Sequence, residues 1–400
     1  MTQSHTDPLP RFPFDADTAL EPPAEWAEFR AKCPVARVTL ASGDEAALVT
    51  RYDDVKSVLS DPRWTRPTPA DNAARVADTE SGGVFNSEMA TVLPQHGEGH
   101  LTWRRTIGKW FTAKRMNALR PGMAAMTEQL IDEMVAKGAP GDLKAGVAFP
   151  LPVWVICDML GVPGTDRDRF AHWSDVMLSM TRYTQAEFDA AQREFGGYMG
   201  GLIAAKRAEP GEDILSALLP EGWSDAMLTA TGIGLLIAGH ETTANMIAKM
   251  VAMLLADRGR WERLLAEPAL VRTAVEESLR LDANAGVGML RYLSDDFEVA
   301  GTVLPGGTTA MCSMAAANRD ERAFDHAEEM DLGRSPNPHL AFGAGAHACL
   351  GQPLARTELQ VVLEVLLRKL PALELAVPAA ELRRVEGLAV GGLRELPVRW

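Results

Sequence analysis

Cysteine is scarce in this chain, which excludes two common ways of stabilising a fold. There are four cysteines in 400 residues, and no two of them have the spacing of a zinc knuckle or a redox CxxC pair. We therefore expect neither a disulfide scaffold nor structural zinc. Isolated cysteines usually act as small buried apolar side chains, and we interpret Cys33, Cys157 and Cys312 in this way. Cys349 stands in a different context.

Positive charge is also in short supply. The chain has 40 lysines and arginines against 54 aspartates and glutamates, a formal net charge of −14. Such a surface repels nucleic acid and anionic membranes, so neither is expected as a partner. Residues 1–10 lack the basic and apolar regions of a secretory signal, which favours a cytoplasmic location. The most apolar stretch, residues 226–256, is long enough to span a bilayer, but polar residues in its middle indicate a buried helix instead.

Apolar periodicity predicts a mainly α chain with a smaller β-rich part. The predicted helices cover residues 53–59, 121–136, 151–160, 166–180, 186–208, 226–256 and 352–369, and the predicted strands cover residues 45–51, 287–293, 296–299 and 308–314. Residues 65–94 mix proline, glycine, asparagine and serine without periodicity, and we interpret them as a candidate substrate lid. No repeat and no polar linker divides the chain, so residues 1–400 are expected to form a single domain.

The strongest local signal is the run FGAGAHACLG over residues 342–351, in which small residues surround Cys349. Its glycines permit tight turns and let the backbone approach a flat cofactor closely. A helical pattern begins directly afterwards, which places Cys349 near backbone N–H groups and a positive dipole end that favour the thiolate. A thiolate held in this way can ligate haem iron and promote O–O bond cleavage. The competing interpretation is a glycine-rich turn around a buried cysteine.

This run resembles the haem-binding loop of the cytochrome P450 family and matches its Phe-Gly-x-Gly-x-His-x-Cys-x-Gly pattern at every fixed position. The resemblance extends over nearly the whole chain. It implies a triangular helical prism that encloses haem b, with Cys349 as the axial ligand of the iron. Within the loop it implies that the cofactor-binding residues are Phe342, Gly343, His347, Cys349 and Gly351.

A second motif, Glu277-Ser278-Leu279-Arg280, places a glutamate and an arginine on one helix face, where their side chains can meet. On its own such a pair is usually exposed and contributes little. The resemblance implies instead a buried network beneath the haem loop, joined by an upstream arginine, for which Arg334 is the candidate. We expect Glu277, Arg280 and Arg334 to fix the cysteine loop.

A third motif, AGHETT over residues 238–243, interrupts the long apolar helix with polar groups that are costly there without a role. Thr242 can bond back to the carbonyl of Ala238, and Gly239 thins the helix, so a local groove is expected. Glu241 and Thr242 supply an acid and a hydroxyl suited to relaying protons. A satisfied polar cluster at a helix contact is the alternative, but the family carries an Ala-Gly-x-Asp/Glu-Thr pattern at this place.

Haem carries two propionates, so its site needs cations. His100 and Arg104 lie one helical turn apart, as does a His-x-x-x-Arg pair of the family. Arg291 and His347 complete the set that the resemblance implies, although each alone could be a solvated charge. The candidate pocket walls, by position in relatives, are residues 84–90, Met177, Leu235, Ala238, residues 287–290 including Val287 and Met289, and residues 389–391 including Val390. Residues 282–288 lack the proline often found there, which is expected to reshape the pocket.

The resemblance implies a monooxygenase that uses dioxygen to hydroxylate or epoxidise a small organic molecule. Electrons from NAD(P)H would arrive through a reductase and a ferredoxin, since the chain contains no fused flavin or iron–sulfur segment. A basic cluster formed by Arg104, Arg105, Lys109, Lys114 and Arg115 is the candidate docking site. The chain also resembles actinobacterial enzymes that tailor secondary metabolites, so a macrolide, terpenoid or cyclic peptide is the expected substrate of a monomeric enzyme.

Three alternatives stay open. The same fold could catalyse oxidative C–C coupling or desaturation. A non-catalytic haem sensor would need haem but no proton relay, so the intact Glu241–Thr242 pair argues against it. Cys349 could also be a hydrolytic nucleophile with His347 as its base, but positions i and i+2 do not face each other on a helix and no oxyanion-forming partner is evident.

Overall fold

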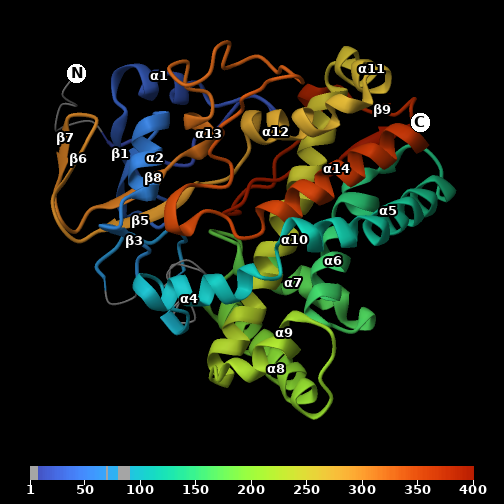
Figure 1. Cartoon of the computed structure of the whole chain (residues 1–400). Helices are drawn as coiled ribbons and strands as arrows, with labels where there is room; N and C mark the ends of the chain where they lie inside the picture. Colours follow the sequence, from blue (N-terminus) through green and yellow to red (C-terminus); the bar gives the residue numbers. More distant parts are fainter. Residues whose placement is uncertain (1–7, 69–70, 80–90) are drawn as a thin grey trace.

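The computed structural model describes residues 8–68, 71–79 and 91–400, and helices dominate it (Figure 1). The helices are α1 (Ala24–Lys32), α2 (Tyr52–Ser60), α4 (Gly97–Gly108), α5 (Ala113–Ala136), α6 (Pro150–Leu160), α7 (Arg167–Met177), α8 (Gln185–Ala208), α9 (Ile214–Leu218), α10 (Asp225–Leu255), α11 (Arg258–Ala266), α12 (Val271–Leu281), α13 (Met314–Ala317) and α14 (Gln352–Lys369). The strands are β1 (Val35–Thr39), β2 (Glu45–Val49), β3 (Trp64–Thr65), β4 (Gly141–Asp142), β5 (Met289–Leu293), β6 (Phe297–Val299), β7 (Thr302–Leu304), β8 (Thr309–Cys312), β9 (Glu374–Leu375) and β10 (Pro397–Arg399). The predicted mainly α fold with a smaller β-rich part is confirmed.

The strands form small sheets that join distant parts of the sequence. The largest has the order β1-β2-β8-β5-β3, with β2 parallel to β8 and Leu48 opposite Met311. In a second sheet β10 lies between β4 and β9. Figure 1 shows the larger sheet on the side of the N-terminus and the long helices on the other side. The β-rich part is therefore built from both ends of the chain.

Helix α10 crosses the middle of the molecule (Figure 1) and packs against α6, α8 and α14. The side chain of Ser224 caps it by accepting the N–H of Met227. From Thr243 to Leu255 every residue is buried, as expected of a helix that is surrounded on all sides. Within the residues described, no helix has both the length and the apolar character that crossing a bilayer requires.

The observed boundaries of one helix and one strand differ from the predicted ones. Helix α5 begins at Ala113 and not at Pro121, which lies inside it. The hydroxyl of Thr112 caps this earlier start, and the side chains of Met116 and Met123 are buried. The cap and the burial together offset the cost of a proline inside the helix, which is about 3 kcal/mol. The strand predicted over residues 308–314 ends at Cys312 because the next residue caps α13. The predicted helix over residues 352–369 is confirmed as α14.

Candidate active site

The cysteine loop connects a short extended segment to the N-terminus of α14. The backbone N–H of Cys349 donates to the carbonyl of Phe342 over 2.7 Å, which closes the loop. Gly343 and Gly345 have φ values of 68° and 70°, which favour glycine. A Cβ atom on Gly345 would also lie 2.6 Å from the carbonyl oxygen of Leu59 in α2. The glycines are therefore required by conformation and by close packing, as predicted.

Cys349 has accessible surface, yet protein surrounds its sulfur deeply enough for burial to raise the pKa of the thiol. Backbone N–H groups of Gly351 and Gln352 and the charge of Arg104 act in the opposite direction but do not outweigh burial. The helix end thus lowers the thiol pKa as predicted, but the prediction that the net pKa is lowered is wrong for the protein alone. A metal cation at the sulfur would supply the missing stabilisation, because a coordinating thiol is deprotonated.

One face of α10 carries exposed residues in the middle of the helix. Gly234, Ala238 and Thr242 are exposed, although they lie in a central helix whose other residues here are buried or half-buried. Their spacing of four places them on one face. Helix α10 and the cysteine loop are linked by α14, which packs against α10 and follows the loop directly. We interpret the exposed face as a candidate wall of the ligand site.

The polar residues of α10 are separated into two environments. The hydroxyl of Thr242 donates to the carbonyl of Ala238 over 2.8 Å, as predicted. Glu241 is buried, and its Oε1 accepts a bond of 2.9 Å from Nδ2 of Asn245. The expected groove is not present as a break, since α10 is continuous through this stretch. The lack of a side chain on Gly239 instead lets α6 approach, because a Cβ atom would lie 2.9 Å from Cγ1 of Ile156.

Five cationic or potentially cationic side chains gather near the loop. The rings of His100 and His347 have centroids 4.2 Å apart. Arg104 donates to the carbonyl of Ala348 in the loop. Burial and the nearby charges of Arg66, Arg291, His100 and Arg104 lower the pKa of His347 to about 3. The structure thus brings together all four predicted propionate ligands.

This cation cluster fits a dianionic ligand. Burial and the charges of Arg291 and Arg104 lower the pKa of Arg66 to about 10. No carboxylate of a described residue raises this pKa. Among the described residues, the buried Nε of Arg291 and Nδ1 of His347 have no hydrogen-bond partner. Two propionates would satisfy both the charge and the unpaired donors. Sequence reasoning missed Arg66, which follows the two-residue strand β3 in a segment without periodicity.

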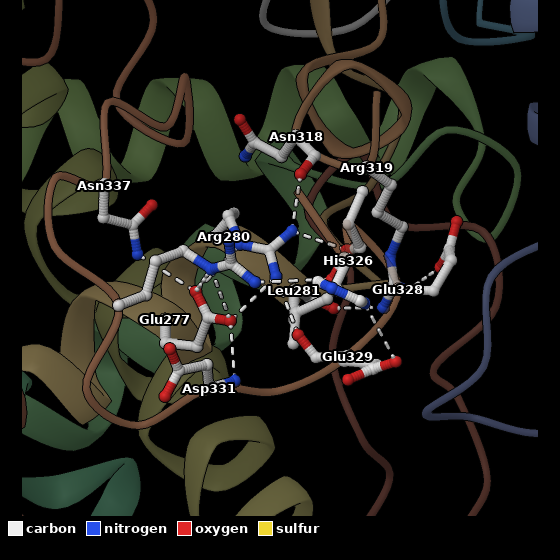
Figure 2. A network of polar contacts seen from close by, with 12 residues as sticks. Glu277, Arg280, Leu281, Asn318, Arg319, His326, Glu328, Glu329, Asp331 and Asn337 are labelled. Atoms are coloured by element: carbon white, nitrogen blue, oxygen red, sulfur yellow. Dashed lines mark hydrogen bonds and ion pairs between the residues drawn. The ribbon is translucent and has the colours of Figure 1, made fainter. Parts of the chain in front are cut away.

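Glu277 lies at the centre of a buried network (Figure 2). Arg280 donates to both of its carboxylate oxygens over 2.8 Å, and Nε of Arg334 donates over 3.1 Å. Asn337 donates over 3.0 Å and the backbone N–H of Asp331 over 2.9 Å. Burial raises the pKa of Glu277, but these bonds outweigh it and the net pKa is lowered. Glu277 therefore binds both Arg280 and Arg334, as predicted, and Asn337 is an additional member of the network.

The predicted pocket residues differ in how deeply they are buried. Met177 and Val287 are buried in apolar clusters, Ala238 is exposed, and Leu235, Met289 and Val390 are half-buried. The backbone N–H of Val287 donates to the carbonyl of Ala389, and the N–H of Ala389 donates to the carbonyl of Leu178, so the segments around residues 177, 287 and 390 adjoin. Residues 84–90 lie outside the described residues, as does part of the predicted lid.

Residues 282–288, which lack the usual proline, are held by a buried ion pair instead. Nζ of Lys249 in α10 donates to Asp282 and to the carbonyl of Asn284, each over 2.6 Å. A Cβ atom on Gly391 would lie 1.9 Å from that same carbonyl oxygen. The two pocket segments thus meet at a contact that only glycine permits.

A mainly helical fold in which a cation cluster lies beside an exposed cysteine in a glycine-rich loop is typical of the class of haem-thiolate proteins, and comparison with known proteins agrees. The family model described as Cytochrome P450 matches residues 207–374. Nocardicin C N-oxygenase of Nocardia uniformis subsp. tsuyamanensis is 41% identical over 97% of this chain and 98% of its own. Mycinamicin IV hydroxylase/epoxidase of Micromonospora griseorubida is 40% identical, with 97% and 98% covered.

Solved structures give the same result. The mixed-function P450 MycG superposes with a TM-score of 0.85 at 39% identity and covers 98% of this chain and 100% of its own. The LnmA cytochrome P450 hydroxylase of Streptomyces atroolivaceus has a TM-score of 0.87 at 38% identity, with 98% and 100% covered. The chain belongs to the cytochrome P450 family. It is a P450 monooxygenase that binds haem b and takes dioxygen, a small organic substrate and electrons from redox partners.

Proposed function

We propose that the protein hydroxylates or epoxidises a secondary metabolite, such as a macrolide, a terpenoid or a cyclic peptide. Relatives support this substrate class by name, since they include an oxygenase of nocardicin C and a hydroxylase/epoxidase of mycinamicin IV. The single observation that carries the proposal is the exposed Cys349 in its glycine-rich loop, beside a cation cluster in which no carboxylate of a described residue forms an ion pair.

Each site residue has a proposed role. Cys349 ligates the iron, and Arg66, His100, Arg104, Arg291 and His347 hold the propionates, with Phe342, Gly343 and Gly351 shaping the loop. When bound, haem supplies the iron centre at which dioxygen is activated. Thr242 lies on the exposed side of α10, and its hydroxyl is the proposed relay group. The carboxyl group of the buried Glu241 is the proposed proton donor. Water or a rotation of Glu241 would connect the two groups.

The proposed electron donor is a ferredoxin served by an NAD(P)H-dependent reductase. The basic cluster lies beside the cysteine loop, because Gly108 in α4 lies against the side chain of Leu350. Lys109 and Lys114 are exposed, and no ion pair joins either to another residue in the part of the chain described. An acidic ferredoxin fits this surface. We further propose a monomeric enzyme in the cytoplasm.

The test is the difference spectrum of the reduced protein with and without carbon monoxide. We expect the absorption band of a thiolate-ligated complex in the wild type and its loss in Cys349→Ser. The matched control is Cys33→Ser, which should keep the band because Cys33 lies outside the site. A colourless wild-type protein would overturn the proposal. Substrate-dependent NAD(P)H consumption with added redox partners distinguishes an enzyme from a haem sensor, and spin-state changes with macrolides, terpenoids and cyclic peptides test the substrate class.

A further inference from the structure

A second carboxylate of α12, next to Glu277, makes contacts that the Glu277 network does not explain. Nε of Arg356 in α14 donates to Oε1 of Glu276 over 2.8 Å, and its Nη2 donates to Oε2 over 3.0 Å. Nε2 of His339 lies 3.1 Å from the same Oε2. The guanidinium of Arg356 also lies 4.5 Å from the centre of the Phe342 ring. We name Glu276, His339, Arg356 and Phe342 the loop clamp.

The hydrogen bonds of the clamp define the state of its histidine. The backbone N–H of Ala341 donates to Nδ1 of His339 over 3.2 Å, so Nδ1 must be an acceptor. The proton of the neutral ring therefore lies on Nε2, which donates to Glu276. Burial would raise the pKa of Glu276, but the bonds from His339 and Arg356 outweigh it and hold the pKa at about 2. The carboxylate is thus an anion at every physiological pH.

The clamp holds both flanks of the cysteine loop to one helix. His339 lies just before the loop, and Arg356 lies in α14, just after it. A single carboxylate therefore fixes the loop at its entry and its exit. Phe342 connects the clamp to the ligand, since its ring stacks on Arg356 and its carbonyl accepts the N–H of Cys349 over 2.7 Å.

The clamp is separate from the Glu277 network. Glu277 is completely buried and binds Arg280, Arg334 and Asn337, all upstream of the loop. The side chains of Glu276 and Arg356 keep 21% and 31% exposure, so their charges remain partly screened by solvent. A bidentate, planar contact of this kind still fixes geometry, which a lysine in place of the arginine would not do.

We propose that Arg356, oriented by Glu276 and His339, is a positioning residue for the iron ligand: it fixes Phe342 and with it the cysteine loop, and it places a positive charge against the Phe342 ring of that loop. The proposal rests on the proposed function, in which Cys349 ligates the haem. Two consequences follow. Removing the positive charge should favour the ferric state and move the reduction potential to more negative values, whereas removing the negative charge of Glu276 should move it to more positive values.

The experiment compares haem-loaded Arg356→Met, Arg356→Lys and Glu276→Gln with the wild type. The readouts are the reduction potential by spectroelectrochemical titration and the temperature at which the reduced carbon monoxide complex loses its thiolate band. All three variants should lose the band at lower temperatures than the wild type. The potential should fall in Arg356→Met, stay near the wild-type value in Arg356→Lys, and rise in Glu276→Gln.

The matched control is Arg368→Met on the same helix, which removes an exposed ion pair with Glu128 of α5 and should change neither readout. Unchanged potentials, or shifts of the same sign in Arg356→Met and Glu276→Gln, overturn the proposal if the wild type shows the thiolate band. A wild type without that band would refute the proposed ligation by Cys349 itself. If Arg356→Met fails to load haem, the proposal is still decided by an unchanged potential in Arg356→Lys and a more positive one in Glu276→Gln.

Discussion

Glu358 in α14 is a buried acid whose protonation makes stability depend on pH. It is 0% exposed, and neither of its carboxyl oxygens has a hydrogen bond of good geometry to a described residue. Burial raises its pKa well above the ordinary value of 4.5, and the hydroxyl of Thr243 in α10 opposes this only in part. Between the ordinary and the raised pKa the folded protein therefore holds a proton that the unfolded chain releases.

The sign of the effect follows from this proton difference. The contribution of Glu358 to stability is complete below pH 4.5 and declines as the pH rises toward the folded-state pKa. The slope is about 1.4 kcal/mol per pH unit over the range between the unfolded-state and the raised folded-state pKa. For 400 residues the unfolding entropy near the midpoint is about 0.84 kcal/mol/K, so this slope corresponds to about 2 °C in Tm per pH unit.

Glu358→Gln keeps the shape of the side chain and removes the titration. We expect the Tm difference between Glu358→Gln and the wild type to grow by about 2 °C per pH unit as the pH rises above 4.5 toward the folded-state pKa, as measured by scanning calorimetry of the haem-loaded proteins at one scan rate. Glu364→Gln on the same helix is the matched control, because Glu364 is half exposed and paired with Arg120, and its difference from the wild type should not vary with pH. Parallel curves for wild type and Glu358→Gln would show that Glu358 is ionised and paired in the folded state, and would refute the argument.

Three further predictions concern the site. Lys109→Glu together with Lys114→Glu should slow reduction by ferredoxin about tenfold at low salt and much less at high salt, with substrate affinity unchanged; equal stopped-flow rates would exclude docking there. Arg66→Met should weaken haem retention about tenfold, measured as haem transfer to an acceptor protein, and unchanged transfer would remove Arg66 from the propionate site. Thr242→Ala should keep the haem spectrum but lower the product formed per NAD(P)H about tenfold or more, and full coupling would exclude its role in proton supply.

The features that sequence predicted well are those defined by local spacing. The geometry of the loop around Cys349 follows from glycine turns at fixed positions. The contact between Glu277 and Arg280 follows from their separation of one helical turn. Arg334 was located only through the family resemblance, since it reaches Glu277 across a long separation in sequence. Arg66 carries no local pattern at all, and its position follows from the pairing of β3 with β5.

Burial explains what sequence could not give. Glu358 looks like an ordinary polar position of an amphipathic helix, but α14 packs against α5, α10 and α12 and leaves it no solvent-facing side. The same reason accounts for the wrong prediction at Cys349, where the local argument from a helix end was sound in direction. Burial by elements distant in sequence outweighed it. Protonation states in this fold are therefore set by tertiary packing more than by neighbours in the chain.

The cation cluster shows how haem binding and folding are coupled. The ring centroids of His100 and His347 lie 4.2 Å apart, and the surrounding arginines lower the pKa values of both rings after the larger effect of burial. In the chain alone these cationic groups repel one another, which opposes the close packing of α4, β3, β5 and the cysteine loop. Bound at this cluster as proposed, a dianionic cofactor would turn the same charges into attractive contacts and would stabilise the fold by mass action. Haem would then be part of the electrostatic balance that holds the loop of Cys349 against the rest of the protein.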